Sequence, residues 1–278
     1  MQDEEKSLER LYMLGLSYEK AGNFERAAQI YREALLIDPE DHGGLVIRLA
    51  AMGKGDTPEG ASLAYVTTLF NQHAEMFDYI LVDQLDYAVP EKLRKAILDL
   101  LANKSEKKEG FCFSRLLDLG CGTGLAAAAF DDLALHKTGV DMAENMVEIA
   151  YEKGDYDQVF VGEACQFLEK NHDTWDLILS TDVLPYMGAL DKFFNLIVQR
   201  LAPDGFFGFS SEIGPDAHFA HPTYKVGPQQ RFAHSEAYIR ECLEKHKLRC
   251  LRVENTTIRL EEGGAVLGQL FISQKNLN

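Results

Sequence analysis

Residues 116–124, Leu-Leu-Asp-Leu-Gly-Cys-Gly-Thr-Gly, combine a carboxylate with closely spaced glycines, a pattern that can bind a nucleotide-sized ligand. The apolar residues around Asp118 predict a buried strand, and the glycines predict a tight turn before an alanine-rich helix. Glycine lets the backbone approach a ligand closely, and the N-terminus of a helix presents free N–H groups. We therefore expect Gly120, Cys121 and Gly122 to contact a bound cofactor.

The spacing of the glycines leaves two classes of cofactor open. Counted from Gly122, residues 122–127 match the G-x-G-x-x-A variant of the dinucleotide fingerprint, whereas the count from Gly120 does not. Asp118 favours the other class, because a carboxylate there would repel a pyrophosphate but would accept hydrogen bonds from an ammonium group. An NAD(P)-dependent oxidoreductase remains the alternative.

Asp141 ends a second predicted strand, residues 137–141. A carboxylate in that position can accept hydrogen bonds from both hydroxyls of a ribose, and it can also cap the following helix. Met142 follows and is placed either to pack on an adenine ring or to lie in the core. Both residues are therefore predicted to bind the cofactor.

These motifs resemble those of the class I S-adenosylmethionine-dependent methyltransferases, whose first motif is similar to residues 118–124. More narrowly, the chain resembles the subgroup in which a tetratricopeptide repeat precedes the methyltransferase domain. The resemblance is strongest at residues 8–41, 113–146 and 175–210. It implies S-adenosyl-L-methionine as cofactor and S-adenosyl-L-homocysteine as product.

The resemblance adds four cofactor contacts after the third and fourth predicted strands. Glu163 stands where the family usually has an aspartate for the adenine amino group, and the backbone N–H of Ala164 would contact the ring. Ser180 and Thr181 would present backbone carbonyls to the amino-acid end of the cofactor. The longer side chain of Glu163 can instead cap the next helix.

Several side chains near the predicted acceptor pocket could act as a general base. They are Glu212, His234, Tyr186, Asp182, His218 and His221. A base is required only if the nucleophile holds its proton at neutral pH. His234 is the first choice because Arg231, three residues earlier, could orient an anionic substrate with its guanidinium fork.

Residues 182–186, Asp-Val-Leu-Pro-Tyr, would face the transferring methyl group. Tyr186 is expected to contact the substrate there. The segment lacks the Asn-Pro-Pro-Tyr signature of amino-methylating enzymes, which favours an oxygen, carbon or small-molecule nitrogen acceptor. The predicted function is methyl transfer to a small molecule; a cofactor-binding sensor or scaffold without turnover is a further alternative.

From residue 111 onward, predicted strands and helices alternate, which indicates a parallel sheet covered on both faces. Strands are predicted near 115–119, 137–141, 157–161, 175–180, 205–210, 248–255 and 265–273, and helices near 124–131, 143–153, 164–170, 188–201 and 235–246. The last two strands are joined through 261–264 without a helix, so the last strand should run antiparallel. The fold class is thus a Rossmann-like seven-stranded methyltransferase sheet, with a long substrate loop at 211–234.

The N-terminal part is predicted to be helical, with one tetratricopeptide-type repeat over residues 8–41. A single helix pair cannot bury its own face, so the repeat should dock on the following domain, a protein partner or a second copy of the chain. Residues 70–78 resemble a lid over the cofactor. The predicted division is a repeat region at 1–55, a linker and lid at 56–110, and the methyltransferase domain at 111–278.

The composition restricts the classes of partner. The formal net charge is −16, which disfavours nucleic acids and anionic membranes because both carry negative charge. The five cysteines show no zinc-ligand spacing, so no metal site is predicted. The N-terminus is acidic, unlike a signal peptide, and no apolar run approaches the ~20 residues of a membrane span, so we expect a soluble cytoplasmic protein.

Overall fold

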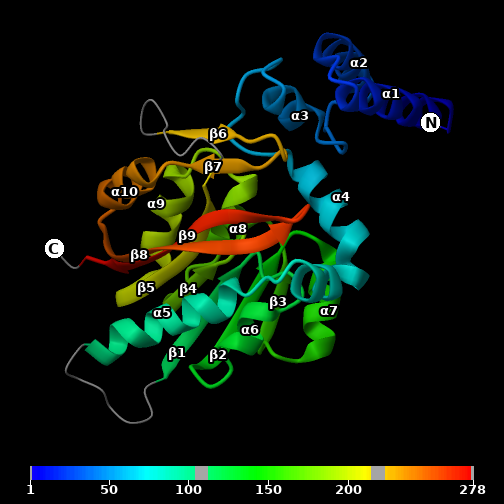
Figure 1. Cartoon of the computed structure of the whole chain (residues 1–278). Coiled ribbons are helices and arrows are strands. Elements are labelled where there is room, and N and C mark those ends of the chain that lie inside the picture. Colours follow the sequence, from blue (N-terminus) through cyan, green and yellow to red (C-terminus); the bar gives the residue numbers. More distant parts are fainter. Residues whose placement is uncertain (1, 104–111, 214–222, 277–278) are drawn as a thin grey trace.

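A computed structural model describes residues 2–103, 112–213 and 223–276. In Figure 1 a helical N-terminal region lies beside one end of an α/β domain, and helix α4 connects the two. Three helices form the N-terminal region: α1 Gln2–Lys20, α2 Phe24–Ile37 and α3 Leu45–Ala51.

The first two helices form the predicted hairpin. Asn23 begins α2 by accepting a hydrogen bond from the backbone N–H of Arg26 (3.2 Å). Gly15 permits the close approach of the two helices, because a Cβ atom there would lie 2.3 Å from Cε1 of Tyr31. The hairpin docks on the chain that follows, as Ser62 Oγ donates a hydrogen bond to the Glu40 carbonyl (2.7 Å).

Four helical segments lead into the sheet: α4 Leu63–His73, the 3₁₀ turn η1 Ala74–Met76, the π-helical η2 Tyr79–Gln84 and α5 Val89–Asn103. Helix α7 supports the lid segment, because Ala74 and Phe77 pack against Met146. A π-helical turn is often found next to a functional site. Here it lies in the segment that covers the cavity described below.

All seven predicted strands of the main sheet are present. They are β1 Phe113–Leu119, β2 Ala134–Asp141, β3 Gln158–Val161, β4 Trp175–Ser180, β5 Leu201–Glu212, β8 Leu248–Glu261 and β9 Gly264–Lys275. Their order is β3-β2-β1-β4-β5-β9-β8, and β9 runs antiparallel to both of its neighbours. The carboxyl ends of β1, β2, β3 and β4 therefore meet at one edge, where ligands of such sheets bind.

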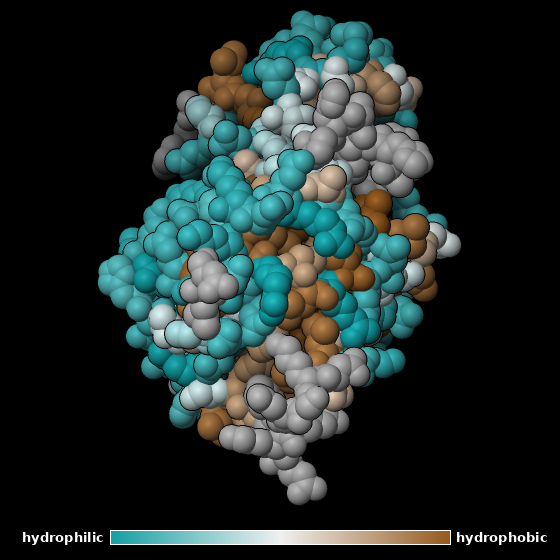
Figure 2. Space-filling model, turned by 90° about the vertical axis from the view of Figure 1, so that its left-hand side faces the viewer, coloured by the Kyte–Doolittle hydropathy of each residue, from teal (hydrophilic) through white to brown (hydrophobic). Residues whose placement is uncertain are grey.

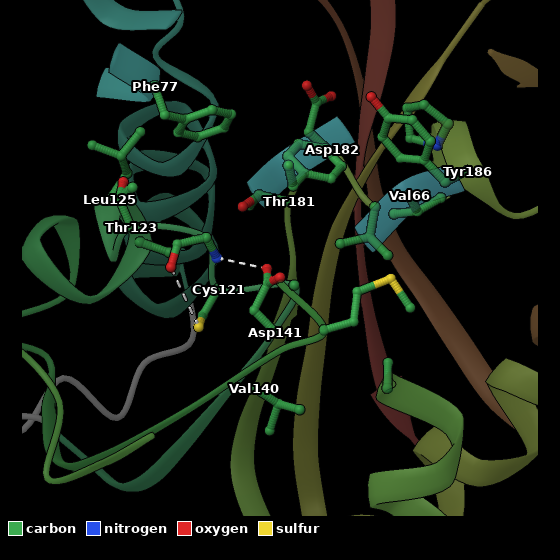
Figure 3. A pocket seen from close by; sticks show the side chains of 18 of the residues that line it. Val66, Phe77, Cys121, Thr123, Leu125, Val140, Asp141, Thr181, Asp182 and Tyr186 are labelled. Atoms are coloured by element: carbon green, nitrogen blue, oxygen red, sulfur yellow. Dashed lines mark hydrogen bonds between the residues drawn. The ribbon is translucent and has the colours of Figure 1, made fainter. Parts of the chain in front are cut away.

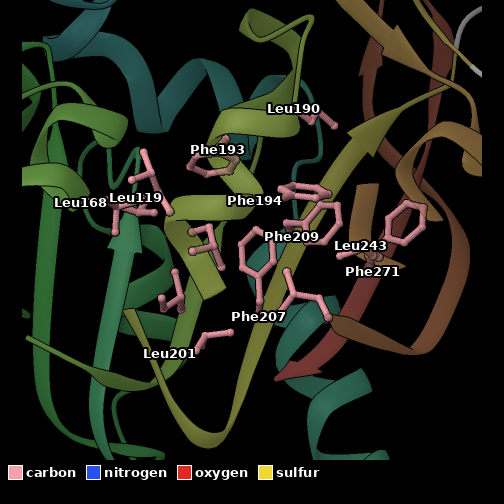
Figure 4. Close-up of a cluster of buried hydrophobic side chains, with 14 of the residues drawn as sticks. Leu119, Leu168, Leu190, Phe193, Phe194, Leu201, Phe207, Phe209, Leu243 and Phe271 are labelled. Carbon is pink, nitrogen blue, oxygen red and sulfur yellow. The ribbon is translucent and has the colours of Figure 1, made fainter. Parts of the chain in front are cut away.

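The helices of the domain cover both faces of the sheet. They are α6 Leu125–Ala129, α7 Glu144–Lys153, α8 Ala164–Lys170, α9 Asp191–Arg200 and α10 Glu236–Lys245, with a 3₁₀ turn η3 at Leu184–Tyr186. One core cluster joins α8, α9 and α10 to the sheet, and another joins α5 and α6 to it. Figure 4 shows the first cluster, in which the rings of Phe207, Phe209 and Phe271 stack, with the last two centroids 5.0 Å apart. This packing fixes β5 and β9 beside the site.

The predicted loop at 211–234 differs from the structure. Its described part contains a second, two-stranded sheet, β6 Tyr224–Val226 and β7 Phe232–His234. Gln230 adopts a positive φ of 56°, and the Gly227 N–H donates to the Arg231 carbonyl (2.8 Å), which closes a tight turn. Strands of three residues carry too little alternation to be read from sequence.

The surface agrees with the acidic composition. Figure 2 shows a face covered mainly by hydrophilic residues, with a strip of hydrophobic residues between them. Within the described residues, no helix is both long enough and apolar enough to span a membrane.

Candidate active site

A cavity lies at the carboxyl edge of the sheet, where the predicted cofactor residues meet (Figure 3). Its cofactor end is formed by residues at or just after the ends of β1, β2 and β3, namely Gly120, Cys121, Gly122, Asp141, Met142, Glu163 and Ala164. Thr181, Asp182 and Tyr186 follow β4 and form the other end, together with side chains from α4. One cavity therefore joins the residues at the ends of β1, β2 and β3 to those that follow β4.

The glycine turn has the backbone that its sequence predicts. Gly120, Gly122 and Gly124 have φ values of 73°, 51° and 99°, which disfavour other residue types. A Cβ atom on Gly120 would lie 2.2 Å from Cγ2 of Val183, and one on Gly122 would lie 3.7 Å from Cε1 of Phe77. The turn is thus held close to β4 on one side and leaves only a narrow space beneath the lid on the other.

Asp141 links the turn to the end of β2. Its Oδ2 accepts a hydrogen bond from the Gly122 N–H (2.9 Å), drawn in Figure 3, and its Oδ1 accepts one from the Ala143 N–H (2.9 Å). Burial raises the pKa of this carboxyl, and the two backbone donors oppose the rise. Each carboxylate oxygen can accept a further bond, so Asp141 can still receive ribose hydroxyls.

Glu163 lines the cavity, but its carboxylate is committed to α8. The two oxygens accept hydrogen bonds from the N–H groups of Cys165 (2.8 Å) and Gln166 (2.8 Å). This is the capping role that its longer side chain allowed. Ala164 and Met142 also line the cavity, and their contacts with an adenine ring stay a prediction.

Asp118 and Ser180 lie behind the wall of the cavity. Neither is among the described residues that line it, and both are fully buried. Asp118 Oδ2 accepts a hydrogen bond from the Tyr156 hydroxyl (2.5 Å), whereas its Oδ1 has no partner within the described chain. Burial raises the pKa of Asp118 to about 7, and the Tyr156 hydrogen bond opposes the rise. We expected Asp118 to contact an ammonium group of the ligand directly. The structure corrects this expectation, because Asp118 lies beneath the glycine turn and does not line the cavity.

Two arginines and three carboxylates form an ion-pair network at the end of the cavity beyond β4. Arg259 Nη1 lies 2.9 Å from Asp182 Oδ2, and its Nη2 lies 2.6 Å from Glu212 Oε1. Arg231 Nε lies 3.0 Å from Glu212 Oε1, and its Nη2 pairs with Glu261. Arg231 lines the cavity as predicted, but its guanidinium fork is occupied by carboxylates of the chain itself.

The geometry argues against two of the predicted bases. Glu212 is buried and both of its oxygens face guanidinium groups, so it holds the arginines in place. His234 is absent from the described lining; its Nε2 lies 3.1 Å from the Gly188 carbonyl and its Nδ1 lies 3.2 Å from Ser211 Oγ. Burial lowers the pKa of His234 to about 4. Since both nitrogens have partners, His234 fastens β7 to the chain after η3.

Tyr186 does lie at the cavity, and Figure 3 shows it near Asp182. Burial, followed by the charge of Asp182, raises the pKa of its hydroxyl, which therefore stays protonated at neutral pH. It can donate a hydrogen bond to an acceptor molecule but cannot serve as a base. His218 and His221 lie outside the described residues.

The lid is fastened to the rest of the site by polar contacts. Asp78 pairs with the hydroxyl of Thr123 in the glycine turn and with Lys153 of α7. Asn71 Oδ1 accepts a hydrogen bond from the Asn145 N–H (3.0 Å). The chain before α4 also crosses this end, since the Ala61 N–H donates to the Tyr186 carbonyl (2.9 Å). The predicted linker therefore contributes a wall.

Helix α4 has two occupied faces. Leu63, Val66 and Phe70 line the cavity, whereas Tyr65 and Leu69 line a groove against α1. His73 lies on the groove side. The helix is therefore a wall shared by the cavity and the repeat.

The described residues fit S-adenosylmethionine. The Gly122 backbone borders the cavity, where an added Cβ atom would lie 3.7 Å from Phe77, and Asp141, the residue predicted to bind the ribose, lies beside it. Val140, Met142 and Leu125 supply apolar surface at the same end. These features suit the adenosine part, and the cavity continues toward Asp182.

The sequence reasoning did not identify Arg259, the partner of Asp182. Strand β8 shifts its register between Thr257 and Arg259, so two consecutive side chains, Ile258 and Arg259, are both buried. An uninterrupted strand would turn one of them outward. The sequence offered one signal, because Arg259 is the single charged residue within 255–260.

Comparisons with known proteins agree with this geometry. The methyltransferase domain family matches residues 85–258, and the tetratricopeptide repeat family matches residues 8–41. Malonyl-[acyl-carrier protein] O-methyltransferase of Bacillus cereus is 27% identical over 141 residues, which cover 49% of this chain and 48% of the relative. The protein of the same name from Acetivibrio thermocellus is 26% identical over 173 residues, 56% of this chain and 58% of the relative. The matched part thus spans about half of the length of these relatives.

A solved structure has the same fold. Magnesium protoporphyrin IX methyltransferase from Synechocystis, with bound S-adenosylhomocysteine, aligns with a TM-score of 0.57 at 15% identity. The alignment covers 77% of this chain and 99% of that one. The methyltransferase domain family matches more than half of the residues of this chain, and the chain therefore belongs to that family.

Proposed function

We propose that the protein transfers the methyl group of S-adenosyl-L-methionine to a small-molecule acceptor. The observation that carries this proposal is the single cavity that runs from the glycine turn and Asp141 to Asp182 and Tyr186. The sulfonium of the cofactor supplies an activated methyl group, so the protein mainly has to align the reactants.

The residues of the chain divide this work between them. The turn and Asp141 hold the adenosine end, while Phe70 and Tyr186 pack edge to face (ring centroids 5.3 Å apart) at the acceptor end. The lid excludes water from the reacting atoms through the contacts of Asp78. Good alignment of this kind can supply roughly 7–11 kcal/mol of the barrier.

The acceptor proposed here is a small molecule rather than nucleic acid, because the net charge of −16 opposes a polyanion. The acceptors named for the relatives are not assigned to this chain. For the repeat we propose a protein partner or a second copy of the chain, bound through the groove between α1 and α4.

Calorimetric titration tests the cofactor assignment. The protein should bind S-adenosylmethionine and S-adenosylhomocysteine but not NADH. Asp141→Asn should weaken both by roughly 10- to 100-fold, since charge-assisted hydrogen bonds contribute about 1.5–3 kcal/mol. The matched control is Asp204→Asn, which changes an exposed aspartate near the start of β5, at the opposite edge of the sheet. Binding of NADH alone, or unchanged affinity in Asp141→Asn, would overturn the assignment.

Turnover is tested separately, with a labelled methyl group and a panel of small hydroxy, amino and carboxylic compounds. Methylated small molecules are the expected products. Tight cofactor binding without any methylated product would favour a sensor or scaffold instead.

A further inference from the structure

The side chain of Asp182 is 22% exposed at the cavity, but one of its two carboxylate oxygens is itself buried. Its Oδ2 is paired with Arg259 Nη1 at 2.9 Å, while its Oδ1 is buried without a hydrogen-bond partner among the described residues. The residue lines the cavity on the side of Tyr186 (Figure 3). An unsatisfied buried oxygen is costly, which indicates that a donor from a ligand belongs there.

We propose that Asp182 is the general base of this site and that the acceptor is a neutral molecule bearing a hydroxyl group on an aromatic body. The proposal rests on the proposed function and names its acceptor class.

The backbone and the ion pair hold Asp182 in one orientation. Its φ of 61° lies in the left-handed region, where aspartate and asparagine are tolerated better than most residues. Its N–H donates to Ser210 Oγ (2.8 Å), which fixes the peptide to β5. Arg259 holds Oδ2 and is itself held by Glu212. Oδ1 is therefore left as the oxygen that can take a proton.

The charges around Asp182 favour a neutral acceptor. Two arginines, Arg231 and Arg259, already face three carboxylates, those of Asp182, Glu212 and Glu261. Among the described residues that line this end, no cation is left over for an anionic substrate. A carboxylate on the acceptor would bring another negative charge next to Oδ1 in a poorly solvated place. The guanidinium group of Arg231, which we expected to bind an anionic substrate, is thus paired with carboxylates of the chain itself.

The apolar surface of the same end favours an aromatic body. Phe70 and Tyr186 meet edge to face, and Phe70 also contacts Phe77 with ring centroids 6.0 Å apart. Val66 and Leu63 extend this surface along α4. Rings gain from edge-to-face contacts beyond the burial of area alone. A flat apolar ring therefore suits the space beside Asp182.

Asp182 accepts the proton that the acceptor loses during methyl transfer. The hydroxyl proton of the acceptor passes to Asp182 Oδ1, and an oxygen electron pair forms the new bond to the methyl carbon. The carbon–sulfur bond breaks, and its electron pair stays on sulfur. The proton is later released to water. A phenolic hydroxyl, with a pKa of about 10, keeps its proton at neutral pH and so needs such a base.

The protonation state of Asp182 is suited to this role. Burial raises its pKa to about 6, and Arg259 opposes the rise. Glu212 on β5 and Glu261 on β8 raise it further, whereas Arg231 lowers it. Asp182 is therefore ionised at pH 7.5 and protonated at pH 5, so the base form should be lost as pH falls through about 6.

The test uses 2-naphthol and 2-naphthoate, which share one ring system and differ in the reacting group. Each is titrated calorimetrically into the complex with S-adenosylhomocysteine at pH 7.5 and pH 5. We expect naphthol to bind at least about tenfold more tightly than naphthoate at pH 7.5, because a hydrogen bond to a charged group contributes about 1.5–3 kcal/mol. The naphthol affinity should fall at pH 5.

Asp182→Asn keeps the size and the positive φ but removes the charge and the titration. In this variant naphthol should bind more weakly, the difference between naphthol and naphthoate should shrink, and the fall at pH 5 should disappear. Formation of methoxynaphthalene from S-adenosylmethionine should lose its rise with pH near 6. Asp204→Asn, also at a positive φ (59°) but exposed, is the control that should leave every value unchanged.

Each contrary result has its own meaning. Equal or tighter binding of naphthoate would overturn the neutral acceptor, and absence of naphthol binding would overturn the aromatic hydroxyl. An Asp182→Asn variant that keeps the naphthol affinity and its pH dependence would overturn the role of Asp182. Failure of S-adenosylhomocysteine to bind the wild type would instead overturn the proposed function, since Asp182 lies at the acceptor end.

Discussion

Replacing Asp118 by asparagine should make the protein more stable at alkaline pH and change the dependence of its stability on pH. Asp118 is fully buried beneath the glycine turn, with Tyr156 as the donor to one of its oxygens. Asparagine has the same shape and can accept the Tyr156 hydrogen bond, but it cannot ionise. The substitution therefore isolates the free energy of placing a charge at this position.

The magnitude follows from the pKa, which is raised from 3.8 to about 7. Below about pH 4 the carboxyl is protonated in both states, and its contribution to stability is fully present. As pH rises toward 7 the unfolded chain releases the proton while the folded chain retains it, so stability falls. The whole change is on the order of 4 kcal/mol, of which about 3 kcal/mol falls between pH 5 and pH 8.

Urea denaturation measures this effect through the fluorescence of Trp175, the single tryptophan, which is buried on β4. The free energy of unfolding of Asp118→Asn minus that of the wild type should rise by about 3 kcal/mol from pH 5 to pH 8. Tyr156→Phe removes the donor that lowers the pKa of Asp118, and it should move the decline of stability to higher pH. A difference between Asp118→Asn and wild type that stays flat across this range would refute the reasoning, because Asp118 would then not titrate there.

Three further changes have outcomes set by the geometry. Gly120→Ala should destabilise the fold by several kcal/mol and weaken cofactor binding, because its Cβ would meet Val183 at 2.2 Å; Gly154→Ala, at a similar φ (75°) with open space around it, should cost only about 1–2 kcal/mol in the same urea assay. Asp78→Asn should speed the dissociation of S-adenosylhomocysteine by severalfold in stopped-flow measurements, because it weakens both lid contacts. His234→Gln should leave the pH profile of methyl transfer unchanged. It should also remove a loss of wild-type stability between pH 6.5 and pH 4, since the folded pKa is about 4; an altered profile would restore His234 as a base.

The fold was predictable because its signals are local and repeated. Strands β1, β2 and β4 each hold a run of buried apolar residues before a polar or glycine residue, and the helices show apolar periodicity. The missing helix at 261–264 correctly indicated the antiparallel last strand. The short strands β6 and β7 were missed because three residues carry no usable pattern.

The site was predictable only where the position of a residue at the end of a strand already determines its neighbours. Gly122 and Asp141 meet because Gly122 follows β1 and Asp141 ends β2, and these two strands are parallel neighbours. Arg259 is distant from Asp182 in the sequence. It contacts Asp182 because of a register shift in β8, which could not be predicted from the sequence. His234 was misjudged for the same reason, since its partners, Gly188 and Ser211, come from other segments.

The double use of helix α4 links the repeat region to the wall of the cavity, since Gly44 of the repeat region lies against Tyr65 of α4. A chain shortened to begin after residue 55 would leave the half-buried Tyr65 and Leu69 more exposed to water, on the face of α4 opposite Phe70. Exchange of the repeat for another would likewise require a new surface to match α4. A substitution that moves α4 therefore changes both the cavity and the groove beside α1, so the acceptor pocket and the repeat must evolve together.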